Sequence, residues 1–525
     1  MQQLSHRSMW FTFSVLLLCV SQARSEEASL TLNLRARSKT VSESVNWQTE
    51  NSPANWKAAE TAIVVCDMWD RHWCPQATAR VGEMAPRMNE VIKAARKQGV
   101  LIIHCPSDTL DFYKDTPQRK LAQSAPKIET AIPLQQWCHL DKSIEGAVLP
   151  IDDSDGGCEC DEPVKNYRAW SRQHPVIEIS DNDAITDSAE AFYLMKQRGI
   201  SNVIVMGVHT NICVLGRPFS IRQMVQQGQN VVLMRDMTDT MYNPKLAPFV
   251  SHFTGTDLVV EHIEKYWCPT ILSTDLIGGN EFRFANDKRK HLVVLCAERE
   301  YQTNESLPKF AKEQLGHDFR VSFVWDDAND TNSMPGIEAV ADADLLLVSV
   351  RRRTLPEAQL QFVRKHIAAG KPVAGIRTAS HAFCLRGKSA PDGLADWPEF
   401  DRQVFGGNYS NHHGAGTKTT ITAETLNASL QQSVFSNVDV KQLLGNGSLY
   451  VVSPLAASTT VILNGQIDNA APEPVAWFNT RSDGGTSFYT SLGHIDDFQN
   501  VHFNQLLKNA LAYLAQQHSN TGRTE

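Results

Sequence analysis

This sequence of 525 residues has few long apolar runs, no excess of positive charge and no paired clusters of cysteine. Beyond the N-terminal segment, no stretch approaches the roughly 18 apolar residues that a transmembrane helix needs, so stable membrane insertion is not expected. The formal net charge of -8 argues against nucleic acid and anionic membranes as partners. We therefore expect a small-molecule ligand, while the oligomeric state, a homo-oligomer included, stays open.

The 11 cysteines are irregularly spaced. Cys158 and Cys160 form a Cys-x-Cys pair within an acidic, glycine-rich loop at residues 152–161. Such a pair without a second one nearby is a weak indication of zinc. An oxidising compartment would permit disulfide bonds, although a chain of this size does not need them.

The N-terminus has the features of a secretory signal peptide. His6 and Arg7 precede an apolar stretch at residues 10–20, and Ser21-Gln22-Ala23 is a small-x-small cleavage site. The apolar stretch is too short to span a bilayer. We expect residues 1–23 to be removed and the mature chain to be exported to the periplasm or secreted.

Strand patterns alternate with helix patterns along the rest of the chain. A half-exposed edge strand is expected at 30–35, where apolar and polar residues alternate. In the first half, apolar strands are expected at 61–66, 100–104, 176–179, 203–206 and 230–234, and helices at 85–99, 187–198 and from Cys213 through 221–227. In the second half, strands are expected at 291–296, 320–324 and 344–350, and a helix at 356–369. This alternation predicts an α/β protein with doubly wound parallel sheets.

Two reactive side chains follow predicted strands of the first half. Asp67 ends the strand 61–66, a poor place for a carboxylate unless a partner pairs with it or a reaction uses it. Cys213 lies past the strand 203–206, where the chain opens a helix whose free N–H groups favour a thiolate and an oxyanion. Cys213 is therefore either a nucleophile or a small buried core residue, which is what free cysteine usually is.

The stretches Asp67-Met-Trp69 and Gly207-Val-His-Thr-Asn-Ile-Cys213-Val, each after a strand, resemble the isochorismatase-like cysteine hydrolases, which include nicotinamidases and N-carbamoylsarcosine amidohydrolase. The resemblance spans residues 55–272 and implies a three-layer α/β fold. It implies Cys213 as the nucleophile and Asp67 as the acid/base, with backbone amides near His209 and Cys213 as the oxyanion hole. Trp69, His209 and Ser180 are then expected to contact the substrate.

One feature of that family is missing. Its catalytic lysine, 33 residues before the cysteine, falls on Ser180. Without a cation, an ionised Asp67 would raise the pKa of the thiol by like-charge repulsion and weaken the nucleophile. Arg172, Lys165 or Arg217 could supply the charge. The alternative is a binding protein with altered chemistry.

Metal is not expected in the first half, and no cofactor is required. Some family members hold a metal with an Asp-x-His motif after the second strand, but here that region, His104–Asp108, lacks the motif. Asp70 and His72 alone are too few ligands to predict a site.

The long loop-rich insertion at 105–170 is more typical of a pocket wall or lid than of a core.

Residues 273–289 are polar and charged and are expected to form a linker. Residues 290–516 resemble the ThuA-like (trehalose utilisation) branch of the class I glutamine amidotransferase-like fold, a flavodoxin-like architecture. The motifs that carry the resemblance are Ala343-Asp-Leu-Leu-Leu-Val-Ser-Val-Arg-Arg-Arg, Gly375-Ile-Arg-Thr-Ala-Ser-His-Ala-Phe, Phe405-Gly-Gly-Asn-Tyr-Ser-Asn-His412-His413-Gly and Tyr489-Thr-Ser-Leu-Gly-His494. The amidotransferase cysteine is absent from its turn, so glutamine hydrolysis is not expected. The family implies a link to sugar metabolism.

His381, His412, His413 and His494 all follow predicted strands of this half. They are expected either to converge at one sheet edge, where His381, His412 and His494 would bind a sugar or a metal, or to donate separate hydrogen bonds to loop backbone.

The whole sequence is best interpreted as an exported hydrolase that cleaves a C–N bond of a small amide, joined to a ThuA-like domain. The alternative is a non-hydrolytic carbohydrate-binding protein.

Overall fold

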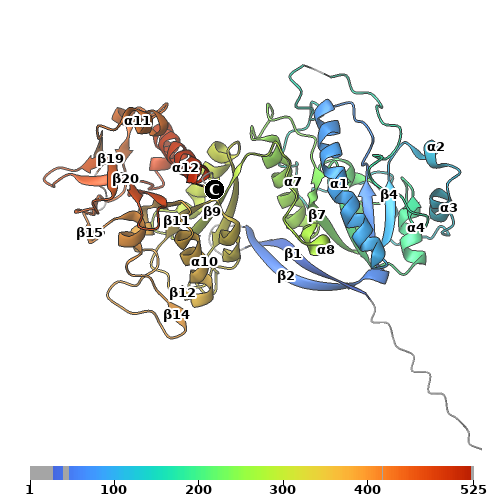
Figure 1. The fold of residues 1–525 in the computed structure, drawn as a ribbon, viewed down its shortest axis with the longest axis horizontal. Helices are drawn as coiled ribbons and strands as arrows, with labels where there is room; N and C mark the ends of the chain where they lie inside the picture. Colours follow the sequence, from blue (N-terminus) through green and yellow to red (C-terminus); the bar gives the residue numbers. More distant parts are fainter. Residues whose placement is uncertain (1–27, 40–46, 163, 415, 417, 522–525) are drawn as a thin grey trace, which may run out of the picture.

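The computed structural model describes residues 28–39, 47–162, 164–414, 416 and 418–521, and it contains two α/β lobes that lie side by side (Figure 1). The predicted signal peptide, residues 1–23, lies outside the described residues. Among the residues that are described, no helix combines the length and the apolar character needed to cross a bilayer.

The first lobe is built around an eight-stranded sheet with the order β2-β1-β8-β7-β6-β3-β4-β5. The strands from β8 to β5 are parallel to their neighbours, whereas β1 pairs antiparallel with β2 and β8. The strands are β1 (Ser29–Lys39), β2 (Trp47–Lys57), β3 (Thr61–Cys66), β4 (Leu101–Cys105), β5 (Ala184–Ile185), β6 (Asn202–Val208), β7 (Asn230–Asp239) and β8 (Thr270–Ile271). The helices are η1 (Ala58–Glu60), α1 (Pro75–Lys97), α2 (Leu110–Tyr113), α3 (Pro117–Gln123), α4 (Glu190–Gln197), α5 (Cys213–Gly216), α6 (Ile221–Gln226), α7 (His252–Tyr266) and α8 (Thr274–Ile277).

The central strands of this sheet are apolar because helices cover both of its faces. Every residue of β3 and β6 is buried. Alternate residues of β3 enter two different cores: Ala62 and Val64 pack toward α4, α6 and α7, and Ile63 and Val65 pack toward α1. A strand that is covered on both faces has an unbroken run of apolar residues, and such runs allowed these strands to be predicted from the sequence.

The second lobe contains a nine-stranded sheet with the order β10-β9-β11-β13-β21-β20-β19-β16-β17. Its first five strands are parallel and the remainder are antiparallel, so the predicted α/β fold is confirmed with an antiparallel extension. The sheet strands are β9 (Lys290–Ala297), β10 (Phe319–Trp325), β11 (Leu345–Val350), β13 (Val373–Ile376), β16 (Thr419–Ala423), β17 (Leu444–Gly445), β19 (Thr459–Gln466), β20 (Glu473–Thr480) and β21 (Thr486–Thr490). Short pairs are β12 (Leu355–Pro356) with β14 (Leu394–Ala395) and β15 (Asn411–His412) with β18 (Tyr450–Val451).

Helices pack on both faces of this second sheet. They are α9 (Thr303–Phe310), η2 (Ala311–Leu315), η3 (Ile337–Asp342), α10 (Glu357–Ala368), η4 (Arg377–His381), η5 (Asp401–Phe405), α11 (Ala428–Val434), η6 (Val440–Gln442), η7 (Asp497–Gln499) and α12 (Val501–Thr521). Residues of α9 and α12 share one core, and residues of η3 and α10 share another.

Four sequence predictions for the first lobe are wrong in detail. The strand predicted at 30–35 is not an edge, because the polar and largely exposed β2 continues the sheet beyond it. Residues 176–179 form no strand, since α1 satisfies their backbone: Asn89 accepts from the N–H of Glu178, and Arg96 donates to its carbonyl. The helix predicted at 85–99 begins earlier, at Pro75.

The fourth error concerns the helix expected from Cys213 onward. It is split into α5 and α6, because Pro218 cannot donate its part of a helical hydrogen-bond ladder. The break has a chemical consequence, since it leaves Arg217 at the end of the short turn that begins at Cys213.

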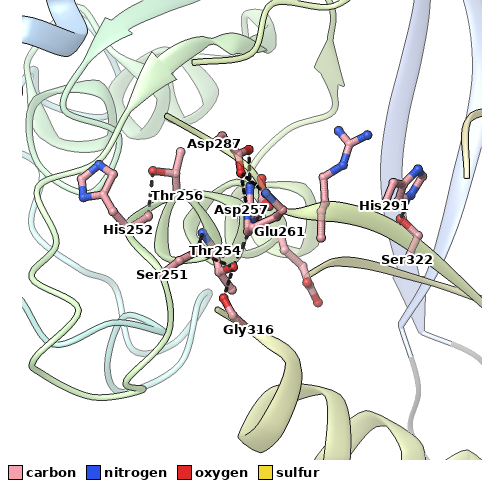
Figure 2. A network of polar contacts seen from close by, with 12 residues as sticks. Ser251, His252, Thr254, Thr256, Asp257, Glu261, Asp287, His291, Gly316 and Ser322 are labelled. Atoms are coloured by element: carbon pink, nitrogen blue, oxygen red, sulfur yellow. Dashed lines mark hydrogen bonds and ion pairs between the residues drawn. The ribbon is translucent and has the colours of Figure 1, made fainter. Parts of the chain in front are cut away.

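The two lobes meet at the start of α7 (Figure 2). The carbonyl of Gly316, in the second lobe, accepts hydrogen bonds from the Ser251 N–H (3.1 Å) and the Thr254 hydroxyl (2.6 Å). Arg289, next to β9, forms an ion pair with Asp257 of α7 at 2.7 Å and donates to Thr254. The predicted linker, residues 273–289, contains α8, and its last residue, Arg289, takes part in a packed contact between the lobes. We call it the interdomain contact (Ser251, Thr254, Asp257, Arg289 and Gly316).

Candidate functional site

Asp67 and Cys213 come together at the carboxyl ends of the adjacent parallel strands β3 and β6. Both are buried, and Cys213 is 6% exposed. Asp67 adopts a left-handed conformation (φ 46°), and its Oδ1 accepts a hydrogen bond from the Ser107 N–H at 2.8 Å. Gly207 allows the two strand ends to approach, since a Cβ there would lie 2.0 Å from the carbonyl oxygen of Cys66.

Arg217 supplies the cation that the sequence lacked at position 180. Its Nε lies 3.5 Å from Asp67 Oδ2, and its Nη2 lies 3.7 Å from an Asp108 carboxylate oxygen. The guanidinium also makes a polar contact with the Cys213 thiol. Asp67 Oδ2 and Arg217 Nε are both buried and face each other at this ion-pair distance.

Asp67, Cys213 and Arg217 shift one another's pKa values. Burial and the Asp67 carboxylate raise the pKa of the Cys213 thiol well above its usual value, while Arg217 opposes the shift. Burial likewise raises the pKa of Asp67, against the influence of Arg217 and the thiol. At neutral pH the resting thiol is therefore protonated, next to a carboxylate whose raised pKa makes it a stronger proton acceptor.

Backbone donors near the nucleophile are only partly free. The carbonyl of His209 accepts from the N–H groups of Ile212 and Val214, and Thr210 donates to the Asp239 carbonyl. No described group accepts a hydrogen bond from the N–H of Cys213. Among the described residues, the N–H groups of both His209 and Cys213, the two amides expected to stabilise an oxyanion, are without a hydrogen-bond acceptor.

Aromatic rings pack against one another next to the segments that carry Asp67 and Cys213. Trp69 stacks on Trp170 with centroids 4.3 Å apart and donates from its indole N–H to the Ser107 carbonyl. His72 lies parallel to Trp170 at 5.8 Å and meets the His209 ring edge-on at 4.9 Å. His209 is buried and its Nε2 has no partner among the described residues; burial and the neighbouring His72 hold its pKa well below the usual value. Trp69 shares a hydrophobic core with Cys213, and the His209 carbonyl accepts from Val214; contact of either residue with a substrate stays a prediction.

Ser180 lies in a different network. Its N–H donates to Asp183, and its carbonyl accepts from Gln118. Asp183 in turn binds Arg96 and the ring of His104. Within the described chain, no contact joins Ser180 to Asp67 or Cys213, so this residue does not take the place of the family lysine.

Asp70 and His72 do not form a metal site with each other. Both oxygens of Asp70 accept from the backbone or hydroxyl of Ser171, and His72 Nδ1 accepts from the N–H of Cys74. One group of potential metal ligands does occur among the described residues, and it consists of Cys74, Cys158 and Cys160.

The second lobe has a pocket of about 250 Å³ at the carboxyl ends of its parallel strands. His381 and His412 line it, as predicted, whereas His494 contacts the pocket only through the ring of Tyr301 at 6.0 Å. His381 stacks on Tyr409 at 4.6 Å, and burial together with Arg352 and Arg351 lowers its pKa to about 3. The full lining is Glu300, Tyr301, Arg351, Arg352, His381, Arg386, Tyr409, His412 and Tyr450.

Comparison with known families assigns both lobes. The profile of the isochorismatase domain matches residues 61–245, and that of the trehalose utilisation (ThuA) family matches residues 291–514. The chain is an isochorismatase-like domain fused to a ThuA-like domain. Its first domain accordingly falls in the cysteine hydrolase superfamily, with Asp67 and Cys213 inside the matched segment.

Three solved structures that resemble the chain each cover less than half of it. A ThuA-like protein from Bacteroides uniformis is 16% identical, covers 45% of this chain and 95% of its own, and has a TM-score of 0.33. A cysteine hydrolase from Pseudomonas syringae is 16% identical, with 42% and 92% coverage and a TM-score of 0.26. An isochorismatase family protein from Burkholderia thailandensis is 16% identical, with 42% and 94% coverage and a TM-score of 0.24. No curated protein matches the chain significantly.

Sequence reasoning named Arg217 as one of three candidate cations but could not choose among them. The signal that would have decided is the Arg217-Pro218 step, because proline ends the turn and leaves the arginine near the cysteine. Two arginines of the ThuA-like pocket, Arg351 and Arg352, lie in a family motif to which the sequence assigned no role, and Arg386 lies outside every motif. Three consecutive basic residues directly after a buried strand, Arg351 to Arg353, could have indicated an anion-binding edge.

Proposed function

We propose that the isochorismatase-like domain hydrolyses a C–N bond in a small amide, and that Asp67, Cys213 and Arg217 form its catalytic set. The observation that carries this proposal is the contact of one buried thiol with both a carboxylate and a guanidinium. A structural cysteine needs neither partner, whereas a nucleophile needs a base to remove its proton and a cation to hold the thiolate. The predicted signal peptide further leads us to propose that the hydrolase is exported.

The reaction follows from the three charges. When substrate enters, the proton of the Cys213 thiol moves to the Asp67 carboxylate, and the sulfur attacks the amide carbon. Arg217 stabilises the thiolate, and the free N–H of Cys213 donates to the oxygen on which negative charge develops. Asp67 then gives its proton to the departing nitrogen, which leaves as the amine or ammonia.

The remaining thioester is cleaved by water. Asp67 removes one proton from that water, the hydroxyl oxygen attacks the thioester carbon, and the carboxylic acid leaves as the C–S bond breaks. The proton returns to the sulfur, so the site is regenerated without a cofactor. Trp69, Trp170 and His209 exclude bulk water and offer aromatic faces, which suits a flat, partly apolar amide.

The test is hydrolysis of a panel of small amides and carbamoyl compounds, with release of ammonia or amine as the readout. The unmodified chain should turn over at least one compound, Cys213→Ala should abolish turnover, and Asp67→Asn should trap little or no thioester in intact-mass spectra. Cys268→Ala is the matched control, because Cys268 is a buried cysteine of the same domain outside the site. Failure of the whole panel together with an unreactive Cys213 would exclude hydrolase chemistry.

We propose a second function for the ThuA-like pocket, the binding of a small anionic sugar derivative. The tyrosine rings provide stacking faces for a sugar ring. Arg352 and Arg386 have no ion-pair partner among the described residues, and three arginines face one acid, Glu300. This charge excess favours a carboxylated or phosphorylated ligand over a neutral one.

Calorimetric titration distinguishes the two kinds of ligand. A uronic acid or sugar phosphate should bind, the matching neutral sugar should bind at least tenfold more weakly, and Arg352→Ala should remove the difference. Lys508→Ala, which removes a cation from α12 outside the pocket, is the control. Equal affinity for charged and neutral sugars would refute the charge argument.

A further inference from the structure

Three cysteines from separated parts of the chain meet beside the candidate active site. Cys74 is buried directly before α1, and Cys158 and Cys160 come from the acidic loop that the sequence left unassigned. Their sulfur atoms all lie within 4.8 Å of one another. Trp73 and Met241 pack around them, so the cluster sits in a partly closed apolar environment.

Burial raises the pKa of Cys74 and Cys158, and backbone N–H groups oppose that rise. The N–H groups of Gln76 and Ala77, in the first turn of α1, donate to the Cys74 sulfur, and the N–H of Cys160 donates to the Cys158 sulfur. Metal-bound thiolates are commonly held by such outer-shell hydrogen bonds. The charge of Cys74 also acts on the Arg80 guanidinium, one of the nearest cations. Hydrogen-bond donors are therefore already present on the side of the cluster that faces α1, and the nearby Arg80 is paired with Asp239 and Glu159.

The spacing is close to that of a metal thiolate. With Zn–S bonds of about 2.3 Å, sulfurs on a zinc tetrahedron are about 3.8 Å apart. The Cys74 and Cys158 sulfurs lie 2.7 Å apart, so an ion between them requires their separation to grow by about 1 Å. Cys158 is half-buried on a loop, and rotation of its side chain supplies this movement.

We propose that Cys74, Cys158 and Cys160 bind one thiophilic metal ion, Zn²⁺ or Cu⁺. Three thiolates complete a trigonal Cu⁺ site, and they leave one position for water on a tetrahedral Zn²⁺. A disulfide bond would use two of the three sulfurs and would gain nothing from the N–H donors. Zn²⁺ and Cu⁺ share this ligand chemistry, and the experiment below separates them.

The site is structural and supports the nucleophile turn. Asp153, in the same acidic loop, accepts a hydrogen bond of 2.7 Å from the Asn211 side chain, two residues before Cys213. The side-chain amide of Asn211 also donates a hydrogen bond to the Met241 carbonyl and accepts one from the Met241 N–H. An ion that fixes the loop to α1 therefore fixes the segment that presents the nucleophile.

The test is metal analysis of the full chain purified under reducing, chelator-free conditions. About one equivalent of zinc or copper per chain is expected by elemental mass spectrometry, and the element found identifies the ion. After chelation, added Co²⁺ should give the thiolate-to-metal charge-transfer absorption of a cysteine-bound ion. Cys74→Ser, Cys158→Ser and Cys160→Ser should each lower occupancy at least tenfold.

Cys384→Ser is the matched control, because Cys384 is a half-buried free cysteine in the ThuA-like domain, and it should retain full metal content. Circular dichroism identifies any variant that fails to fold, and the metal content of the unmodified chain decides the proposal independently of the variants. Absence of bound metal after reduction and incubation with Zn²⁺ or Cu⁺ would overturn the proposal. So would a Cys74–Cys158 disulfide in peptide mass maps of a chain that takes up no metal once reduced.

Discussion

At the scale of single residues, the proposed catalytic set has an arginine from the turn after β6 where the resembling family has a lysine from a strand. Arg217 reaches Asp67 and Cys213 from the turn that carries the nucleophile itself. A guanidinium stays charged under all ordinary conditions and offers several donors, so it can contact carboxylate and thiolate together. In the proposed catalytic set, the cation therefore comes from a different position in the sequence than the family lysine, and its positive charge is kept.

Variants of Arg217 test whether this arginine acts as the cation of the proposed catalytic set. Arg217→Met should reduce kcat/KM for a hydrolysed amide by roughly 10- to 1,000-fold, because loss of a neighbouring cation raises a thiol pKa by about 1–3 units. Arg217→Lys should restore part of the loss. The pH profile of Cys213 alkylation provides the second measurement, since Arg217→Met should move its midpoint to higher pH. An unchanged midpoint would mean that another group holds the thiolate.

His366 makes folding stability depend on pH. It is 3% exposed, its Nε2 lies 3.1 Å from the Pro372 carbonyl, and burial lowers its pKa to about 4. The unfolded chain, with a pKa near ~6.5, binds the proton first on acidification, so this histidine destabilises the fold progressively between about pH 6.5 and 4. Denaturant unfolding of His366→Gln should show roughly 3 kcal/mol less acid-induced loss than the unmodified chain. Parallel pH curves for the two proteins would exclude this role.

At the scale of elements, the candidate site depends on how closely β3 and β6 approach at their carboxyl ends. Gly207 has φ 115° and leaves no room for a Cβ against the Cys66 carbonyl. The conformation and the contact both require glycine, one residue before the chain turns toward Cys213. The geometry of the nucleophile is therefore fixed by backbone packing as well as by side chains.

Gly207→Ala should destabilise the first domain by at least about 2 kcal/mol, because it combines a disfavoured φ with a steric overlap. It should also lower the alkylation rate of Cys213. The matched variant is Gly82→Ala in α1, where the nearest atom to a new Cβ is 3.8 Å away in the His174 ring. That change should stabilise by up to about 1 kcal/mol, since alanine favours a helix. Equal effects of the two substitutions in thermal unfolding would contradict the assignment.

At the scale of the whole molecule, the two domains are joined by a polar contact in addition to the chain itself. Gly316 presents its carbonyl to Ser251 and Thr254, and a Cβ at this position would lie 2.4 Å from the Val250 side chain. The hairpin of β1 and β2 also reaches the second domain, since Asn51 donates to Glu338 at 2.9 Å (Figure 1). We expect these contacts to couple the unfolding of the two domains.

Gly316→Ala should uncouple the domains without unfolding either one. We expect a single calorimetric transition to separate into two, and faster hydrogen exchange at residues 251–254. Gly414→Ala is the control, because no atom lies within 4 Å of a Cβ there. If the transition of Gly316→Ala remains single and unshifted, the interdomain contact does not couple the domains.

The sequence alone determined both family resemblances, the central strands and the pairing of Asp67 with Cys213. These depend on local order: an apolar run buried on both faces, and a reactive residue directly after it. The tertiary structure decided the rest. Folding removed Ser180 from the site and brought Cys74 to the Cys-x-Cys pair, 84 residues further along the chain. Contacts of this kind join segments whose separation along the chain carries no information about their distance in space, whereas Arg217 lies in the same turn as Cys213 and the proline after it was a local signal.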